Sequence, residues 1–159
     1  MGNWLTQPGD LIQISRGLYS HWAVYVGDGY VVHMTTPSGV SGAASSSLRS
    51  APNEKAMVRK QKLQEAVGDS KWEISNSLDK MYRPRSPRII VEEALRQVGK
   101  RMEYSVTRKN CEHFATKLRY GKAVSFQVSG PNFFLCGCGE NREGLAMLDR
   151  IKTLYFPAL

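Results

Sequence analysis

Cys111 is the residue of this sequence best placed to act as a nucleophile. It lies in residues 110–114 (NCEHF), at the start of a segment that predicts a helix ending at Tyr120, with Gly121 as its stop. Unpaired backbone N–H groups and the positive end of the helix dipole favour a thiolate at such a start. A lone intracellular cysteine is more often a small buried hydrophobic residue. The nucleophile hypothesis therefore needs a base from elsewhere in the chain.

His113 is poorly placed to be that base. Side chains two positions apart on a helix point about 200° away from each other. His113 should therefore face away from Cys111, either solvated or supporting the site without touching the reacting groups. The other histidines, His21 and His33, lie far upstream.

The two upstream histidines flank the strongest strand signal of the chain. Residues 22–26 (WAVYV) and 30–34 (YVVHM) are rich in β-branched and aromatic residues. Residues 27–29 (GDG) between them are typical of a hairpin turn. The sequence therefore predicts that His21 and His33 lie on adjacent antiparallel strands.

The length of the hairpin loop decides whether the two imidazoles can meet. A three-residue loop pairs Val26 with Tyr30 and Ala23 with His33. His21 and His33 then share one face as diagonal neighbours, roughly 7–8 Å apart at the backbone. A two-residue loop shifts the register by one residue and places the histidines on opposite faces. A catalytic pair therefore requires the odd loop.

Further strands and a second helix are expected around this core. Strand candidates are residues 11–14, 56–58 and 72–74, with a brief extended piece within 102–107. Residues 35–54, rich in Gly, Pro and Ser, predict a long loop.

The second helix has recognisable ends. Ser86 and Pro87 suit its N-cap and first position, and Gly99 suits its stop. Its apolar stripe is predicted to comprise Val91, Ala94, Leu95 and Val98. Together with the strands it predicts an α+β fold with one domain at residues 8–122. Residues 123–159 form a C-terminal tail that predicts a short amphipathic helix and no membrane span.

Composition limits the class of protein. The 159 residues are 42% hydrophobic and 23% charged, which is typical of a globular chain. Three cysteines, two of them at positions 136 and 138, make no convincing disulfide framework, and the first residues lack the pattern of a secretory signal. We therefore expect a reducing, cytoplasmic setting. We also expect a monomer.

The net charge of +8 is concentrated in the middle of the chain. Residues 51–122 carry seventeen basic and nine acidic side chains, whereas the two flanking segments are each neutral. No nucleic-acid-binding module or aromatic-rich signature accompanies this excess, so an anionic membrane surface is the preferred partner over nucleic acid. The candidates for contact with lipid are Arg83, Arg85, Arg88, Lys100 and Arg101.

A helix that opens with cysteine and packs on a sheet whose hairpin carries histidine is the arrangement of papain-like thiol enzymes. Here the histidines precede the cysteine, so the fold would be a circular permutation. A zinc site built from Cys111, His113, His21 and His33 is the competing interpretation. Its weakness is that Cys111 and His113 would point apart on one helix.

Four motifs in order carry a resemblance to a known family. They are residues 8–12 (PGDLI), 21–33 (HWAVYVGDGYVVH), 110–114 (NCEHF) and 118–121 (LRYG). Together they resemble the lecithin retinol acyltransferase family and, within it, the phospholipase A and acyltransferase subfamily, also called H-Ras-like suppressors. The similarity runs from about Pro8 to Gly121.

The resemblance implies roles for individual residues. Cys111 would be the nucleophile, His21 the general base and His33 the residue that orients and polarises His21. Tyr19 matches a family position and, with backbone N–H groups near Asn110, would help to hold the oxyanion. The implied enzyme needs no metal and no cofactor.

The implied activity is that of a phospholipase A1/A2 and acyltransferase. It would take an acyl chain from a glycerophospholipid through a Cys111 thioester and pass it to water, to the amine of phosphatidylethanolamine or to a lysophospholipid. The enzyme would associate peripherally with intracellular membranes. The alternative on the same fold is a non-catalytic regulator of growth signalling that binds membranes or proteins.

Overall fold

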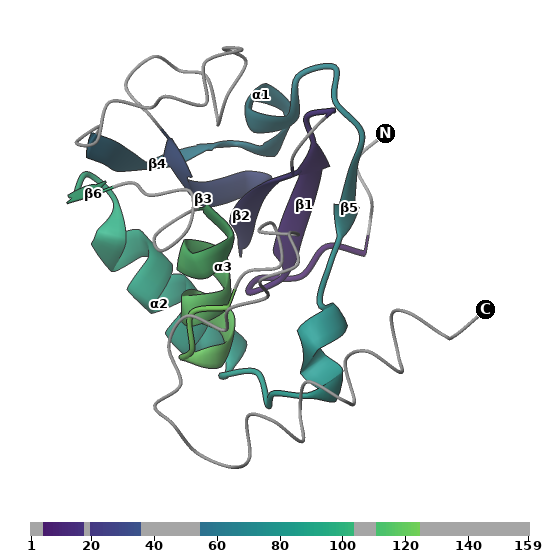
Figure 1. The fold of residues 1–159 in the computed structure, drawn as a ribbon, viewed down its shortest axis with the longest axis vertical. Helices are drawn as coiled ribbons and strands as arrows, with labels where there is room; N and C mark the ends of the chain where they lie inside the picture. Colours follow the sequence, from purple (N-terminus) through teal and green to yellow (C-terminus); the bar gives the residue numbers. More distant parts are fainter. Residues whose placement is uncertain (1–4, 18–19, 36–54, 104–110, 125–159) are drawn as a thin grey trace, which may run out of the picture.

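The computed structural model describes residues 5–17, 20–35, 55–103 and 111–124. Within them, six antiparallel strands form one sheet in the order β5-β1-β2-β3-β4-β6 (Figure 1). The strands are β1 (Leu11–Ser15), β2 (Ser20–Gly27), β3 (Tyr30–Thr35), β4 (Lys55–Lys62), β5 (Trp72–Ile74) and β6 (Arg101–Glu103). The strands predicted from the sequence are present, except that residues 104–107 of the expected extended piece lie outside the described residues. The α+β class is confirmed.

In the described part of the chain, three helices pack against this sheet: α1 (Leu63–Val67), α2 (Pro87–Gln97) and α3 (Cys111–Tyr120). A short 3-10 helix, η1 (Ser77–Lys80), follows β5. Helix α1 and η1 were not predicted from the sequence, because segments of four or five residues are too short to show helical periodicity. The predicted ends of α2 and α3 are confirmed, with Ser86 at the N-cap of α2 and Gly121, at φ 73°, after α3.

The sheet separates two hydrophobic clusters. Helices α2 and α3 lie over one face, where Val24, Val32 and Val58 pack with Phe114 and Leu118. Short helix α1 covers the other face. The buried residues of that second cluster are Ile12, Ile14, Ala23, Val31, Leu63, Ala66 and Val67. Because alternate residues of a strand point to opposite faces, His21 and His33 share the face of Ala23 and Val31.

The β2–β3 hairpin reaches the predicted histidine register by a different route. The turn has two residues, Asp28 and Gly29, both with positive φ, as the tight turn of a twisted hairpin requires. Gly27 therefore pairs with Tyr30, and the predicted Val26–Tyr30 pairing is wrong. A bulge between Tyr25 and Gly27 absorbs one residue.

The bulge restores the alignment that the even turn would have lost. Ala23 pairs with His33, as predicted, and His21 and His33 keep the same face. The loop-length prediction was wrong because it treated the strand as regular. An extra residue in the strand compensates for the residue missing from the turn.

The predicted apolar stripe of α2 is only partly buried. Ala94 is fully buried, but the side chains of Leu95 and Val98 remain 41% and 39% exposed. The buried position that the stripe omitted is Ile90. The helix is therefore rotated relative to the prediction, and an apolar flank faces solvent.

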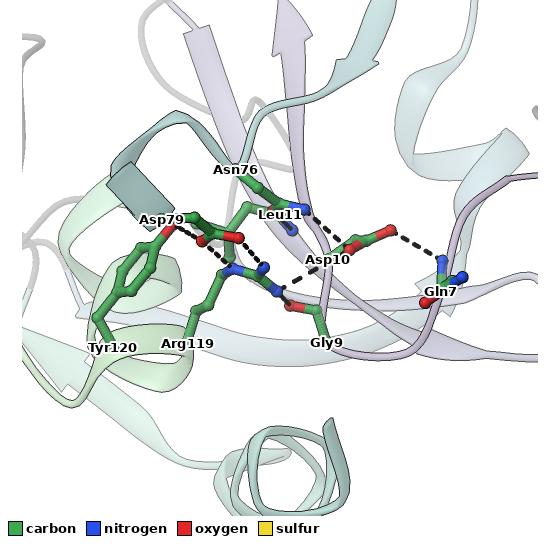
Figure 2. A network of polar contacts seen from close by, with 8 residues as sticks. All are labelled: Gln7, Gly9, Asp10, Leu11, Asn76, Asp79, Arg119 and Tyr120. Atoms are coloured by element: carbon green, nitrogen blue, oxygen red, sulfur yellow. Dashed lines mark hydrogen bonds and ion pairs between the residues drawn. The ribbon is translucent and has the colours of Figure 1, made fainter. Parts of the chain in front are cut away.

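Helix α3 is fixed at its C-terminal end by a network of polar contacts (Figure 2). The Arg119 guanidinium donates to both carboxylate oxygens of Asp79, at 3.0 and 2.6 Å, and to the carbonyl of Gly9 at 2.8 Å. The Tyr120 hydroxyl donates to Asp79 at 2.6 Å, and Asn76 links Asp10 to the backbone of Leu11. The network ties α3 to η1 and to the start of β1.

Across the described ranges, no helix has the length and apolar character needed to cross a membrane.

Candidate active site

The Cys111 thiol lies at the first residue of α3 and close to the start of β2. Its side chain is 4% exposed, and Sγ is 3.9 Å from the carbonyl oxygen of Ser20. Gln13 on β1 donates to the Ser20 hydroxyl at 2.8 Å. The thiol is therefore held beside the backbone of the residue that immediately precedes His21.

His21 and His33 form a buried pair. Their exposed fractions are 1% and 2%, and Nε2 of His21 lies 2.8 Å from Nδ1 of His33. The two rings meet edge to face, with centroids 5.1 Å apart. The juxtaposition predicted from the hairpin register is confirmed, and the contact is a direct hydrogen bond.

Both imidazoles are neutral at physiological pH. Burial, followed by the proximity of His33 and Arg16, lowers the pKa of His21 to about 3. Burial is also the main cause that lowers the pKa of His33 to about 4, although a hydrogen bond with Gln61 opposes the shift. A neutral imidazole carries a lone pair that can accept a proton, which is the state that a general base needs.

Gln61 is a site residue that sequence reasoning missed. Its side-chain oxygen lies 3.0 Å from Nε2 of His33. Gln61 stands on β4, opposite Val31 of β3. No local motif marks this glutamine, and only the β3–β4 register could have identified it as a diagonal neighbour of His33.

Comparison with known proteins agrees with this geometry. The model of the family described as lecithin retinol acyltransferase matches residues 5–124. The chain belongs to this family. The match contains the hairpin, both histidines and the whole of α3.

Individual family members are similar over most of their length. Phospholipase A and acyltransferase 3 of Homo sapiens is 48% identical over 149 residues, which are 94% of this chain and 90% of that protein. Phospholipase A and acyltransferase 4 of Homo sapiens is also 48% identical, over 122 residues, or 77% and 74% of the two chains. Phospholipase A and acyltransferase 1 of Homo sapiens is 39% identical over 122 residues, or 77% and 72%. The resemblance read from the motifs is thereby confirmed down to the subfamily.

Of the other residues considered near the site, Tyr19 and Asn110, assigned to the oxyanion, lie outside the described residues, whereas His113 is described by the structure. His113 is 6% exposed, so its predicted solvated alternative is wrong. Helix α3 is buried nearly all round, and His113 lines a cavity together with Glu93 and Gln97 of α2.

The basic candidates for membrane contact also differ from one another. Arg83, Arg88, Lys100 and Arg101 are exposed. Arg85 is half-buried; its backbone N–H donates to the Arg119 carbonyl at 2.8 Å and its guanidinium contacts the Leu118 carbonyl at 3.4 Å. Arg85 therefore contributes to the end of α3, whichever surface it also meets.

A cavity of about 790 Å³ lies along α3, one turn from Cys111. Its volume is within the usual range for a small-molecule pocket. Apolar side chains and charged groups share the lining, which is made by Met34, Arg85, Glu93, Gln97, Met102, Glu103, His113, Phe114, Lys117, Leu118, Gly121 and Ala123. A cavity of this mixed character suits an amphiphilic molecule.

The zinc interpretation gains no support from the described part of the chain. Within it, no group of three or more His, Cys, Asp or Glu side chains is arranged to hold a metal ion. One ring nitrogen of His21 and one of His33 are already used in the hydrogen bond between the two rings.

Proposed function

We propose that this protein is a thiol-dependent phospholipase A and acyltransferase acting on glycerophospholipids. The observation that carries the proposal is the buried, neutral His21–His33 pair at the start of the strand that the Cys111 thiol contacts. The names of the relatives, phospholipase A and acyltransferase, support the substrate class. Thiolate attack and an oxyanion hole suffice for the chemistry, so the proposed mechanism uses no metal or cofactor.

The first half-reaction forms a thioester. His21 takes the thiol proton of Cys111 as Sγ attacks the carbonyl carbon of the substrate ester. The tetrahedral oxyanion collapses and breaks the bond to the glycerol oxygen, which receives the proton from His21. A lysophospholipid leaves, and the acyl group remains on sulfur.

The second half-reaction transfers the acyl group. His21 accepts a proton from water, from the amine of phosphatidylethanolamine or from the hydroxyl of a lysophospholipid. That acceptor attacks the thioester, and the sulfur leaves and recovers its proton from His21. Hydrolysis and acyl transfer therefore differ only in the acceptor. Tyr19 and the backbone near Asn110 would bind the oxyanion in both steps.

The order of these parts along the chain supports a circularly permuted papain-like fold. In this proposal α3 plays the part of the helix that carries the nucleophile, and the β2–β3 hairpin supplies the histidines. The cavity beside Phe114 and Leu118 would receive the acyl chain, with the charged side chains of its lining toward the headgroup.

The membrane surface is the proposed location of the substrate. The exposed apolar flank of α2, with Leu95 and Val98, lies on the same helix as the exposed Arg88 and is followed by Lys100 and Arg101. Each basic residue close to anionic lipid contributes about 1 kcal/mol. Charge reversal at Arg83, Arg88 and Arg101 should weaken binding to vesicles containing phosphatidylserine and leave hydrolysis of a monomeric ester unchanged. Vesicle binding that changes neither with salt concentration nor with the content of anionic lipid would contradict this part of the proposal.

The decisive experiment is intact mass spectrometry after brief exposure to phosphatidylcholine, followed by peptide mapping. The expected result is one acyl adduct on Cys111. Cys111→Ser should lack the adduct and all turnover while keeping the wild-type melting temperature, because a hydroxyl is a poor nucleophile in a site built for a thiol.

The two cysteines of the tail provide the matched control. A variant with Cys136→Ser and Cys138→Ser should form the adduct as the wild type does. An adduct on the tail, or turnover by Cys111→Ser within tenfold of the wild type, would refute the nucleophile assignment. A protein that binds vesicles without adduct or product would be the non-catalytic alternative.

A further inference from the structure

Gln61 stands at the far end of a row of hydrogen-bonded side chains that begins at His21. We infer that Gln61 is a positioning residue that determines which ring nitrogen of His21 is free to take the thiol proton. This inference rests on the proposed function, in which His21 is the general base. The residue acts through His33 and touches no reacting atom.

The row follows from the strand register. Ala23 of β2 pairs with His33, and Val31 of β3 pairs with Gln61. His21 lies two residues before Ala23, and His33 lies two residues after Val31. His21, His33 and Gln61 are therefore successive diagonal neighbours across three adjacent strands, on one face of the sheet. The two contacts of the row measure 2.8 and 3.0 Å.

The hydrogen-bonding capacity of each group determines which atom donates and which accepts in each contact of the row. The side-chain oxygen of Gln61 only accepts hydrogen bonds, so Nε2 of His33 must carry the hydrogen. A neutral imidazole carries one ring hydrogen, and His33 is neutral. Nδ1 of His33 is therefore an acceptor, and Nε2 of His21 must donate to it. His21 is neutral as well, which leaves the lone pair on its Nδ1.

That lone pair is what the proposed reaction requires. When His21 takes the thiol proton on Nδ1, its Nε2 hydrogen bond to His33 need not break, and no atom of the row must move. Without the Gln61 acceptor, the His33 ring could equally carry its hydrogen on Nδ1. His21 would then accept on Nε2 and hold its hydrogen on Nδ1, where it could not act as a base.

The wild-type protein tests the inference directly. Long-range proton–nitrogen correlation spectra of the histidine-labelled protein near pH 7 distinguish the two tautomers of each ring. Both His21 and His33 should carry hydrogen on Nε2. Hydrogen on Nδ1 of His21 would overturn the inference, whatever the activity of the enzyme.

Variants at position 61 test the functional consequence. Gln61→Met keeps the length of the side chain and removes the acceptor, whereas Gln61→Glu keeps an acceptor. We expect Gln61→Met to show mixed tautomers and a kcat for a monomeric ester lowered about tenfold or more, part of the roughly 10²–10⁴-fold that a positioned base contributes. KM should change less than twofold, and Gln61→Glu should retain at least half of kcat. Gln64→Met, on the exposed surface of α1, is the matched control.

The outcomes separate this inference from the proposed function. Unchanged tautomers and kcat in Gln61→Met would show that Gln61 does not direct the pair. Loss of activity in Gln61→Met and Gln61→Glu alike, with wild-type tautomers in both, would also overturn the inference. A wild-type protein with the expected tautomers but no acyl adduct would instead refute the proposed function and leave the tautomer assignment standing.

Discussion

The two ends of α3 are both buried in polar surroundings, but they use different kinds of polar group. At the first residue, the Cys111 thiol lies 3.9 Å from the carbonyl oxygen of Ser20, the residue before His21 of the neutral imidazole pair. In the last turn, Arg119 and Tyr120 bind the carboxylate of Asp79 (Figure 2). Neutral groups can exchange a proton at low cost, whereas a paired buried charge resists any change of state.

The causes of the pKa shifts also differ between the two ends of α3. At the Cys111 end, burial lowers the pKa of both histidines, so both rings are neutral near pH 7 and each keeps one nitrogen lone pair. At the other end, burial raises the pKa of Asp79, but hydrogen bonds from Arg119 and Tyr120 outweigh it and hold the pKa below its usual value. One end is suited to proton transfer and the other to holding the helix in place.

Replacing the proposed base should have the largest effect and should change activity alone. In His21→Gln the amide can still bond to His33, but it has no nitrogen that accepts the thiol proton. Turnover of a monomeric ester should fall by roughly 10²–10⁴-fold. The free energy of unfolding should change by less than about 1.5 kcal/mol, as for other swaps that conserve volume. Retention of a tenth of the activity would mean that the imidazole is not the base.

Removing Arg119 from its ion pair with Asp79 should instead lower the free energy of unfolding. Arg119→Met removes three donors from Asp79 and Gly9, and loss of one partner from a buried ion pair costs roughly 3–5 kcal/mol. We expect the lower end, about 3 kcal/mol, because Asp79 is 36% exposed and solvent screens it. Urea denaturation measures the loss.

Lys117→Met is the matched control, since Lys117 is an exposed basic residue on the same helix. It should change the free energy of unfolding by less than about 0.5 kcal/mol. Well below its melting temperature, Arg119→Met should keep ester turnover within tenfold of the wild type. Large activity loss without loss of stability in that variant would erase the contrast between the two ends.

The sequence was sufficient to predict the parts of the site that depend on local signals. Cys111 at a helix start, the strands on either side of the GDG turn, and Gly121 as a stop all follow from short-range patterns. The bulge between Tyr25 and Gly27 left no such signal, and only its result, the pairing of Ala23 with His33, agreed with the prediction.

Contacts between distant segments could not be predicted from the residues alone. Gln61 meets His33 from 28 positions away, and Asp79 meets Arg119 from 40 positions away. Each is an ordinary polar residue in its own segment. The exposed Leu95 and Val98 show the same limit, because periodicity gives the apolar side of a helix but not how far the sheet covers it.

Acid should also separate the two ends, because the histidines and Asp79 titrate in different pH ranges. The histidines bind protons near pH 6.5 when unfolded but only near pH 3 and 4 when folded. Between these values the unfolded state holds more protons, so stability is full above pH 6.5 and falls as pH is lowered. The slope should reach about 1.4 kcal/mol per pH unit for each histidine. Asp79, with its lowered pKa, should lose its contribution only below its unfolded value of 3.8.

Urea denaturation between pH 7 and pH 4 measures this slope, and His33→Gln is the variant that tests its origin. Glutamine binds no proton, so the slope should be shallower by about the share of one histidine. His113, whose pKa burial also lowers, remains in both proteins and contributes equally to each. An unchanged slope in His33→Gln would mean that the pair already binds a proton in the folded state. The Cys111 end would then be charged like the other, and the contrast between a neutral end and an ionic, anchoring end would be lost.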